Sequence, residues 1–189
     1  MSKILYITPG CFDKGGISRY CRYQITALRE LFPSRDLYTM SLLGEEADSF
    51  EEEFTVDYAG KGNSRLEQIK FALWFCWQML IKRPEIVHCA HVNFSGLVVL
   101  MARIVGSKTI LNVYGLELWS GLRPDASYGL KRIESIISDC HSTKDYLLNE
   151  KIRIEEDITV IWDCVDLEKF KPYSLELDLI KSKYNIENG

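Results

Sequence analysis

Hydrophobic residues come in short unbroken runs separated by longer amphipathic stretches, and this alternation repeats along the chain. The first run, within residues 3–8, ends at Pro9-Gly10, which is typical of a strand buried on both faces. Similar runs predict seven strands, at residues 3–8, 36–43, 54–58, 86–90, 108–114, 136–140 and 158–162. Helical spacing predicts helices at residues 17–32, 66–83, 94–105 and 143–149.

Strands that alternate with helices need crossover connections, and these connect parallel strands. We therefore predict the α/β class, as a Rossmann-like three-layer α/β/α sandwich with a mostly parallel sheet. Residues 1–172 form this predicted domain, with an acidic, solvated loop at residues 45–53. Residues 173–189 contain no further strand, and we expect them to be an interdomain linker or amphipathic helix.

The two longest predicted helices differ in their apolar pattern. In residues 17–32 the apolar positions form one stripe, which predicts packing on the sheet; they are Ile17, Cys21, Ile25, Leu28 and Phe32. Residues 71–81 are apolar almost throughout and lie between Lys70 and the pair Lys82-Arg83. This run is too short to span about 30 Å of hydrocarbon. A core helix is the plain interpretation, and a helix that also docks at a membrane surface is the sharper one.

Composition restricts the class of protein. The chain has 189 residues, of which 47% are apolar and 26% charged, as in a soluble globular domain. A net charge of −4 without a basic stripe disfavours nucleic-acid binding, which needs clustered cations. Six scattered cysteines without a Cys-x-x-Cys pair predict neither a metal nor a redox site. With a strand directly after Met-Ser-Lys, we expect a cytoplasmic protein that also reaches the inner face of the cell membrane.

A glycine pair follows the first strand, where a helix begins. Gly15 and Gly16 allow close backbone approach, and the helix dipole favours an anion there. The pattern is neither G-x-G-x-x-G nor a P-loop, which disfavours a nicotinamide cofactor and a P-loop nucleotide. A plain turn with a helix cap is the alternative interpretation.

Polar and aromatic residues also follow the fourth, fifth and sixth predicted strands: His91, Asn93, Tyr114, Glu117, Trp119, Ser142 and Thr143. Each has a plain interpretation: His91 as a core or cap residue, Glu117 as a solvated charge, Ser142 as an N-cap. The carboxyl ends of parallel strands share one edge of the sheet, where ligands bind. The convergence of these seven residues at this edge predicts a binding cleft.

The order of several segments resembles the amino-terminal domain of family 4 glycosyltransferases, which are retaining GT-B enzymes. These segments are Lys3-Ile-Leu-Tyr-Ile, Gly15-Gly-Ile-Ser-Arg19, Val87-His-Cys-Ala-His91, Val113-Tyr-Gly-Leu-Glu117, Ser138-Asp-Cys-His-Ser142 and residues 160–172. The last segment contains Val165-Asp166, Phe170 and Pro172, where members commonly have Asn-Gly-Val-Asp followed by Phe and Pro.

The resemblance implies roles for matching positions. Gly15, Gly16 and Arg19 would face the diphosphate of a nucleotide-sugar co-substrate, with no tightly bound cofactor and no metal. Tyr114, where members usually carry His, and Glu117 would face the transferred sugar as catalytic residues. Asp166 and Phe170 would match the hinge.

The expected function is the acceptor-binding half of a retaining enzyme of polysaccharide biosynthesis, with His91, Asn93 and Trp119 in substrate binding. Its acceptor would be a glycan, a lipid-linked sugar or a small molecule. The expected partners are the sugar acceptor and a separate carboxyl-terminal donor domain, without which this chain would be inactive. A non-catalytic glycan- or partner-binding module is the alternative. A relative of epimerases or glycogen synthases matches the segments less well.

Overall fold

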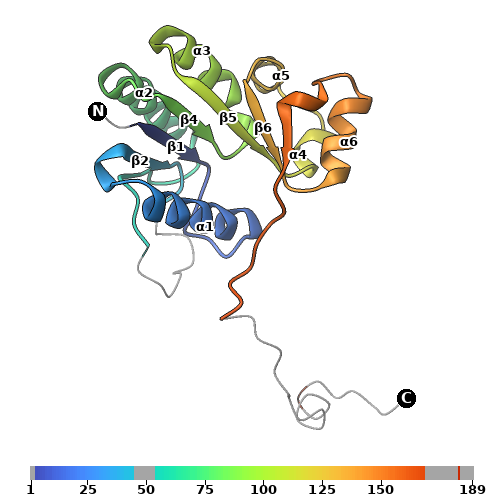
Figure 1. The fold of residues 1–189 in the computed structure, drawn as a ribbon. Helices are drawn as coiled ribbons and strands as arrows, with labels where there is room; N and C mark the ends of the chain where they lie inside the picture. Colours follow the sequence, from blue (N-terminus) through green and yellow to red (C-terminus); the bar gives the residue numbers. More distant parts are fainter. Residues whose placement is uncertain (1–2, 45–53, 169–182, 184–189) are drawn as a thin grey trace.

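The computed structural model describes residues 3–44, 54–168 and 183. It confirms the predicted class: seven parallel strands form one sheet, in the order β3-β2-β1-β4-β5-β6-β7 (Figure 1). The strands are β1 (Ile4–Thr8), β2 (Leu37–Ser41), β3 (Tyr58–Ala59), β4 (Ile86–Cys89), β5 (Lys108–Val113), β6 (Ser135–Ser138) and β7 (Ile158–Val160). The helices are α1 (Gly16–Leu31), α2 (Arg65–Lys82), α3 (Ser95–Val105), α4 (Leu116–Trp119), α5 (Pro124–Leu130) and α6 (His141–Asn149), with short 3-10 turns at Ser34–Asp36, Val92–Phe94 and Glu155–Asp157.

Helices cover both faces of the sheet. On one face, α2, α3, α5 and α6 bury a core that includes Phe75, Val98, Leu130 and Leu147. On the other face, α1 packs the predicted stripe against β1, with Cys21 and Ile25 fully buried. Figure 1 shows α1 below the sheet and α2 and α3 above it. The stripe prediction for this helix is therefore confirmed.

Local signals explain where several helices begin and end. Ser64 caps α2 by accepting a hydrogen bond from the Glu67 amide at 3.3 Å. α3 ends at Gly106, whose φ of 80° lies in the left-handed region that glycine adopts without strain. α5 begins at Pro124, which suits a first helical position because its missing N–H would have no intrahelical partner.

The structure corrects several sequence predictions. The strand expected at residues 54–58 is reduced to Tyr58–Ala59, and the last strand ends at Val160 rather than at residue 162. Helices α4 and α5 were not predicted. Cys140, not Ser142, is the N-cap residue of α6. The predicted acidic loop (45–53), Phe170 and all of the predicted linker helix (173–189) except Lys183 lie outside the described residues.

Candidate functional site

The order of the strands places the topological switch point at the carboxyl edge between β1 and β4. The chain leaves β1 toward β2 through α1 on one face, and leaves β4 toward β5 through α3 on the other. The loops that follow these two neighbouring strands therefore diverge, which is the usual ligand position in an open parallel sheet. Residues 9–15 and 90–94 form the two sides of this switch point.

The loop after β1 is held from within by a buried arginine. Arg22, which is 5% exposed, donates hydrogen bonds to the carbonyl oxygens of Cys11 and Asp13. The Asp13 carboxylate accepts a hydrogen bond from the Gly15 amide at 3.2 Å. These contacts set the path of the loop, so Arg22 is a positioning residue that the sequence analysis missed.

Gly15 and Gly16 are both exposed at the start of α1, as predicted. Gly15 has a φ of −68°, so no left-handed backbone requires glycine there, and an added Cβ would lie 3.2 Å from Oδ1 of Asp13. A Cβ on Gly16 would meet no atom within 4 Å. Space for a close approach to the backbone is the property that these glycines provide.

The amino terminus of α1 can hold an anion. No side chain caps its first amides, and its first turn has no acidic residue. Arg19 lies in this turn and is partly buried. The aligned peptide dipoles give such a terminus a partial positive charge, which stabilises a nearby anion.

Tyr114, at the end of β5, contacts α1 through an aromatic ring and β4 through a chain of polar groups. Its ring packs edge-on against Tyr20, with 6.1 Å between centroids. Its hydroxyl accepts a hydrogen bond from the Asn112 amide at 3.3 Å, and the Asn112 oxygen lies 2.8 Å from Nε2 of His88. Burial raises the pKa of Tyr114 well above its ordinary value near 10, so the phenol stays protonated.

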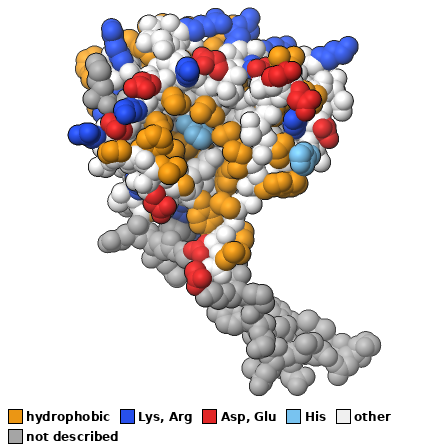
Figure 2. All heavy atoms as spheres, in the orientation of Figure 1, with side chains coloured by type: hydrophobic (Ala, Val, Ile, Leu, Met, Phe, Trp, Pro, Cys, Tyr) orange, Lys and Arg blue, Asp and Glu red, His pale blue; other side chains and the backbone are white. Residues whose placement is uncertain are grey.

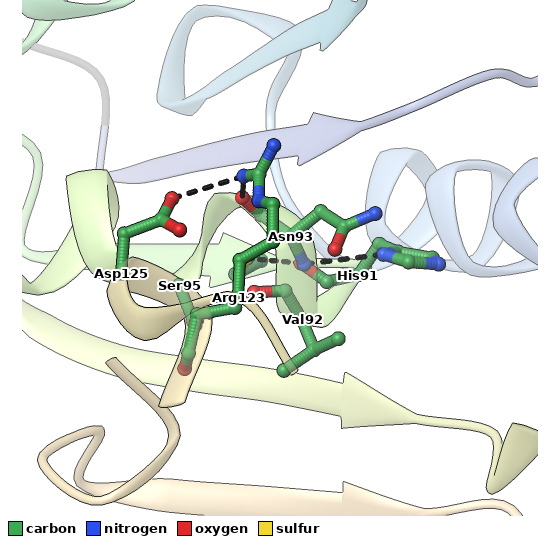
Figure 3. A network of polar contacts seen from close by, with 8 residues as sticks. His91, Val92, Asn93, Ser95, Arg123 and Asp125 are labelled. Carbon is green, nitrogen blue, oxygen red and sulfur yellow. Dashed lines mark hydrogen bonds and ion pairs between the residues drawn. The ribbon is translucent and has the colours of Figure 1, made fainter. Parts of the chain in front are cut away.

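Glu117 and His91 lie near one another at the same edge. The Glu117 carboxylate accepts a hydrogen bond from the Tyr114 amide at 2.7 Å. Nδ1 of His91 accepts one from the Asn93 amide at 3.2 Å, so His91 is a cap residue, as its plain interpretation held (Figure 3). Burial lowers the pKa of His91 and the Glu117 charge raises it, with burial the larger effect. The imidazole is therefore neutral near pH 7, with its proton on Nε2.

A cavity of about 330 Å³ opens beside the switch point, at the ends of β1 and β4. Its apolar lining comes from Pro9, Leu42, Phe71, Ala72, Phe94 and Leu97, and its polar lining from Asn63, Gln68, Asn93, Arg123 and Asp125. Arg123 donates to the Asn93 carbonyl at 3.1 Å and to Asp125 at 2.9 Å, as Figure 3 shows. Of the predicted site residues, only Asn93 lines this cavity. The other four polar lining residues are Asn63, Gln68, Arg123 and Asp125, and they come from segments that the sequence predicts to be loops or a core helix.

The remaining predicted residues lie toward α6 and α1. Trp119 is half exposed and packs edge-on against Tyr146 of α6. Thr143 is buried and Ser142 exposed, both in the first turn of α6. The Asp166 amide donates to the Tyr23 hydroxyl at 3.3 Å, which holds the segment after β7 against α1.

Two carboxylates at the end of the sheet were missed by the sequence analysis. Within the described ranges, Oδ1 of Asp139 is buried without a hydrogen-bond partner. Partial desolvation, and then the Asp139 charge, raise the pKa of Asp163. Burial, and then the Asp163 charge, raise the pKa of Tyr20. A buried acceptor of this kind suits a ligand hydroxyl. Residues 3–44 and 54–168 contain no cluster of three or more His, Cys, Asp or Glu able to hold a metal ion.

Solved structures share this fold. The chain matches HepE from Anabaena in complex with UDP with a TM-score of 0.67 at 10% identity, over 99% of this chain and 51% of that one. It matches a glycosyltransferase from Rickettsia africae with a TM-score of 0.61 at 16% identity, over 100% and 50% of the two chains. The lipopolysaccharide outer core galactosyltransferase WaaB matches with a TM-score of 0.63 at 16% identity, over 87% and 46%.

The chain has the Rossmann-like fold of GT-B glycosyltransferases. It spans about half the length of the solved structures that it matches. No family model matches the sequence, and no curated protein sequence matches it.

Replacing Arg22 by methionine should destabilise the domain. The change keeps an unbranched, largely apolar side chain but leaves the Cys11 and Asp13 carbonyls without their donor. We expect a loss of about 1–3 kcal/mol in the free energy of unfolding, measured by urea denaturation. Arg35→Met is the control, because the Arg35 side chain is 86% exposed. Equal stability of both variants would contradict the role of Arg22.

Acidification should destabilise the fold through its buried histidines. Burial lowers the folded-state pKa of His88 and of His91, so the unfolded chain binds more protons below its ordinary histidine pKa of 6.5. Stability therefore falls as the pH drops through that value. We expect a lower Tm at pH 5.5 than at pH 7.5, and a smaller difference in His88→Gln. An unchanged pH dependence in that variant would contradict the contribution of His88.

Proposed function

We propose that this chain is the acceptor-side half of a retaining family 4 glycosyltransferase. The complete enzyme would transfer a sugar from a nucleotide-diphosphate sugar to a glycan, lipid-linked or small-molecule acceptor. The observation that carries the proposal is the uncapped amino terminus of α1 at the β1–β4 switch point, on the helix whose Tyr20 packs against Tyr114. The similarity in fold to HepE, which was solved with UDP, supports a nucleotide of this class.

In the proposed mechanism the start of α1 stabilises the leaving diphosphate. Developing negative charge on the phosphate oxygens would face the first amides of the helix and the Arg19 guanidinium. Gly15 and Gly16 let the phosphates reach the backbone, because no side chain stands in front of it. This preorganised positive end needs no reorganisation as the glycosidic bond to the diphosphate breaks.

Tyr114, Glu117 and His91 would orient the transferred sugar rather than exchange protons with it. The phenol of Tyr114 stays protonated, so it can donate a hydrogen bond but cannot act as a base. The neutral His91 has a donor at Nε2, and the Glu117 carboxylate is fixed by the Tyr114 amide. Such an arrangement suits a retaining reaction in which the enzyme supplies no obvious nucleophile.

The acceptor would occupy the 330 Å³ cavity. Its apolar lining, which includes the partly exposed Phe94 and Leu97, suits the apolar face of a sugar ring. Amides from Asn93 and Gln68 and the Arg123 guanidinium can bond hydroxyl groups along its rim. Trp119 lies next to α6 and would contact an acceptor that extends beyond this cavity.

A second domain would supply the nucleotide-binding half. The complete enzyme would be cytoplasmic. Domain closure would hold donor and acceptor within reacting distance, which accounts for much of the rate of such a reaction. We therefore expect the chain of 189 residues to catalyse no transfer by itself. The alternative is a non-catalytic module that binds a glycan or a partner protein through the same cavity.

The test separates binding from transfer. Titration of UDP into the ¹⁵N-labelled chain should shift the amide resonances of residues 15–19, and titration of oligosaccharides should shift those around Asn93 and Arg123. The gene product that includes any downstream domain is then assayed with nucleotide sugars and acceptors. Glycan shifts without UDP shifts would support the non-catalytic module. Robust transfer by the 189-residue chain alone would refute the half-enzyme proposal.

A further inference from the structure

The outer face of α2 is apolar although it faces solvent. Its inner face packs Phe71, Phe75 and Met79 into the core. Ten residues of the helix are exposed, and seven of these are large and apolar. They are Leu66, Ile69, Leu73, Trp74, Trp77, Leu80 and Ile81, each between 38% and 66% exposed. A surface helix normally has a polar outer face, so this face indicates a binding surface.

The neighbouring helix α3 also exposes apolar side chains. α3 packs beside α2 and exposes Leu100 and Ile104, at 53% and 61%. We call these nine side chains of α2 and α3 the outer patch. One side of α2 is therefore core, as its plain interpretation predicted, and the other side is exposed.

Basic residues flank the outer patch. Residues 65–83 contain four basic side chains and one acidic one, and residues 95–108 contain two basic and no acidic ones, in a chain with a net charge of −4. Arg65 lies at the start of α2, Arg83 directly after its end, and Arg103 and Lys108 near the end of α3; all four are exposed. Figure 2 shows Lys and Arg side chains gathered along the upper edge of the molecule, where Figure 1 places α3.

An anionic lipid surface matches both features. Trp and Leu side chains on one side of a helix enter the boundary between headgroups and acyl chains, and flanking cations attract acidic headgroups. No helix among the described residues is long and apolar enough to cross a membrane. A second copy of the chain fits less well, because a two-fold interface would bring the same basic flanks toward each other.

We propose that the outer patch docks this protein on an anionic membrane surface, with α2 and α3 lying along the plane of the headgroups. The proposal rests on the exposure and charge of these two helices and is independent of the proposed sugar transfer. It is tested with the full chain and vesicles of phosphatidylcholine, with and without one third phosphatidylglycerol. We expect sedimentation with the anionic vesicles, weakened by high salt, and a blue shift of tryptophan emission.

The variants separate docking from folding. Leu73→Glu with Trp77→Glu should lower the vesicle partition coefficient about tenfold or more, because two large apolar side chains no longer enter the lipid. The matched control is Ile154→Glu, a similarly exposed apolar position outside the patch, which should bind as the unaltered chain does. Circular dichroism checks that all variants are folded. No binding to anionic vesicles, or equal binding of the double variant, would overturn the proposal. A concentration-dependent dimer abolished by the double variant, without vesicle binding, would assign the patch to a protein interface instead.

Discussion

Replacing Gly129 by alanine should strongly destabilise this domain. A Cβ at this position would lie closer than 3.0 Å to the backbone atoms of Ser95 and Gly96, where α5 crosses the start of α3. Ser95 also donates hydrogen bonds to the Val92 and Ala126 carbonyls, which ties the two helices together at this point. Backbone atoms cannot move aside as a flexible side chain can, so the helices would have to separate.

We expect a loss of about 3 kcal/mol or more in the free energy of unfolding, at the upper end of overpacking effects. Urea denaturation followed by circular dichroism measures it. Gly16→Ala is the matched control, because an added Cβ there meets no atom within 4 Å. If Gly129→Ala were as stable as Gly16→Ala, α3 and α5 would not be in the close contact described.

The second large effect is expected on catalysis, from Gly16→Val. The fold should tolerate valine, since the position is exposed and the space around it is open. A branched side chain would, however, stand in front of the first amides of α1 and keep a diphosphate away from them. Loss of one preorganised donor to a developing anion commonly costs about 100-fold in rate. We expect a fall of this order in kcat/KM for sugar transfer by the protein that carries the donor-binding domain.

Gly16→Ala again serves as control and should keep most of the activity, because its single methyl group leaves more room for the phosphates. Thermal unfolding of each variant checks that the fold is retained. Unaltered transfer by Gly16→Val would reduce Gly16 to a turn residue and remove the proposed diphosphate site.

Much of the fold was readable from short-range patterns. The continuous apolar run of β1 predicts a buried parallel strand because both faces of such a strand are covered, and the apolar-rich segments of β4 and β5 predict further strands. The single stripe in α1 predicts that only one side of this helix packs on the sheet. Helices α4 and α5 were not readable, because Gly115, Gly121, Pro124 and Gly129 make this stretch resemble a loop. α5 is stabilised by its fit against α3, which local propensity does not report.

The sequence by itself determined the alternation of strands and helices outside the β5–β6 connection, and the edge at which polar residues gather. The tertiary structure alone decided which of them share a site. Asn63, Gln68, Asn93, Arg123 and Asp125 meet in one cavity although up to 62 positions separate them, because parallel strands and their crossovers bring distant loops together. It also decided the roles of the two sides of α2. Both sides are apolar in sequence, and only the packing of the inner one on the sheet shows that the outer one is exposed.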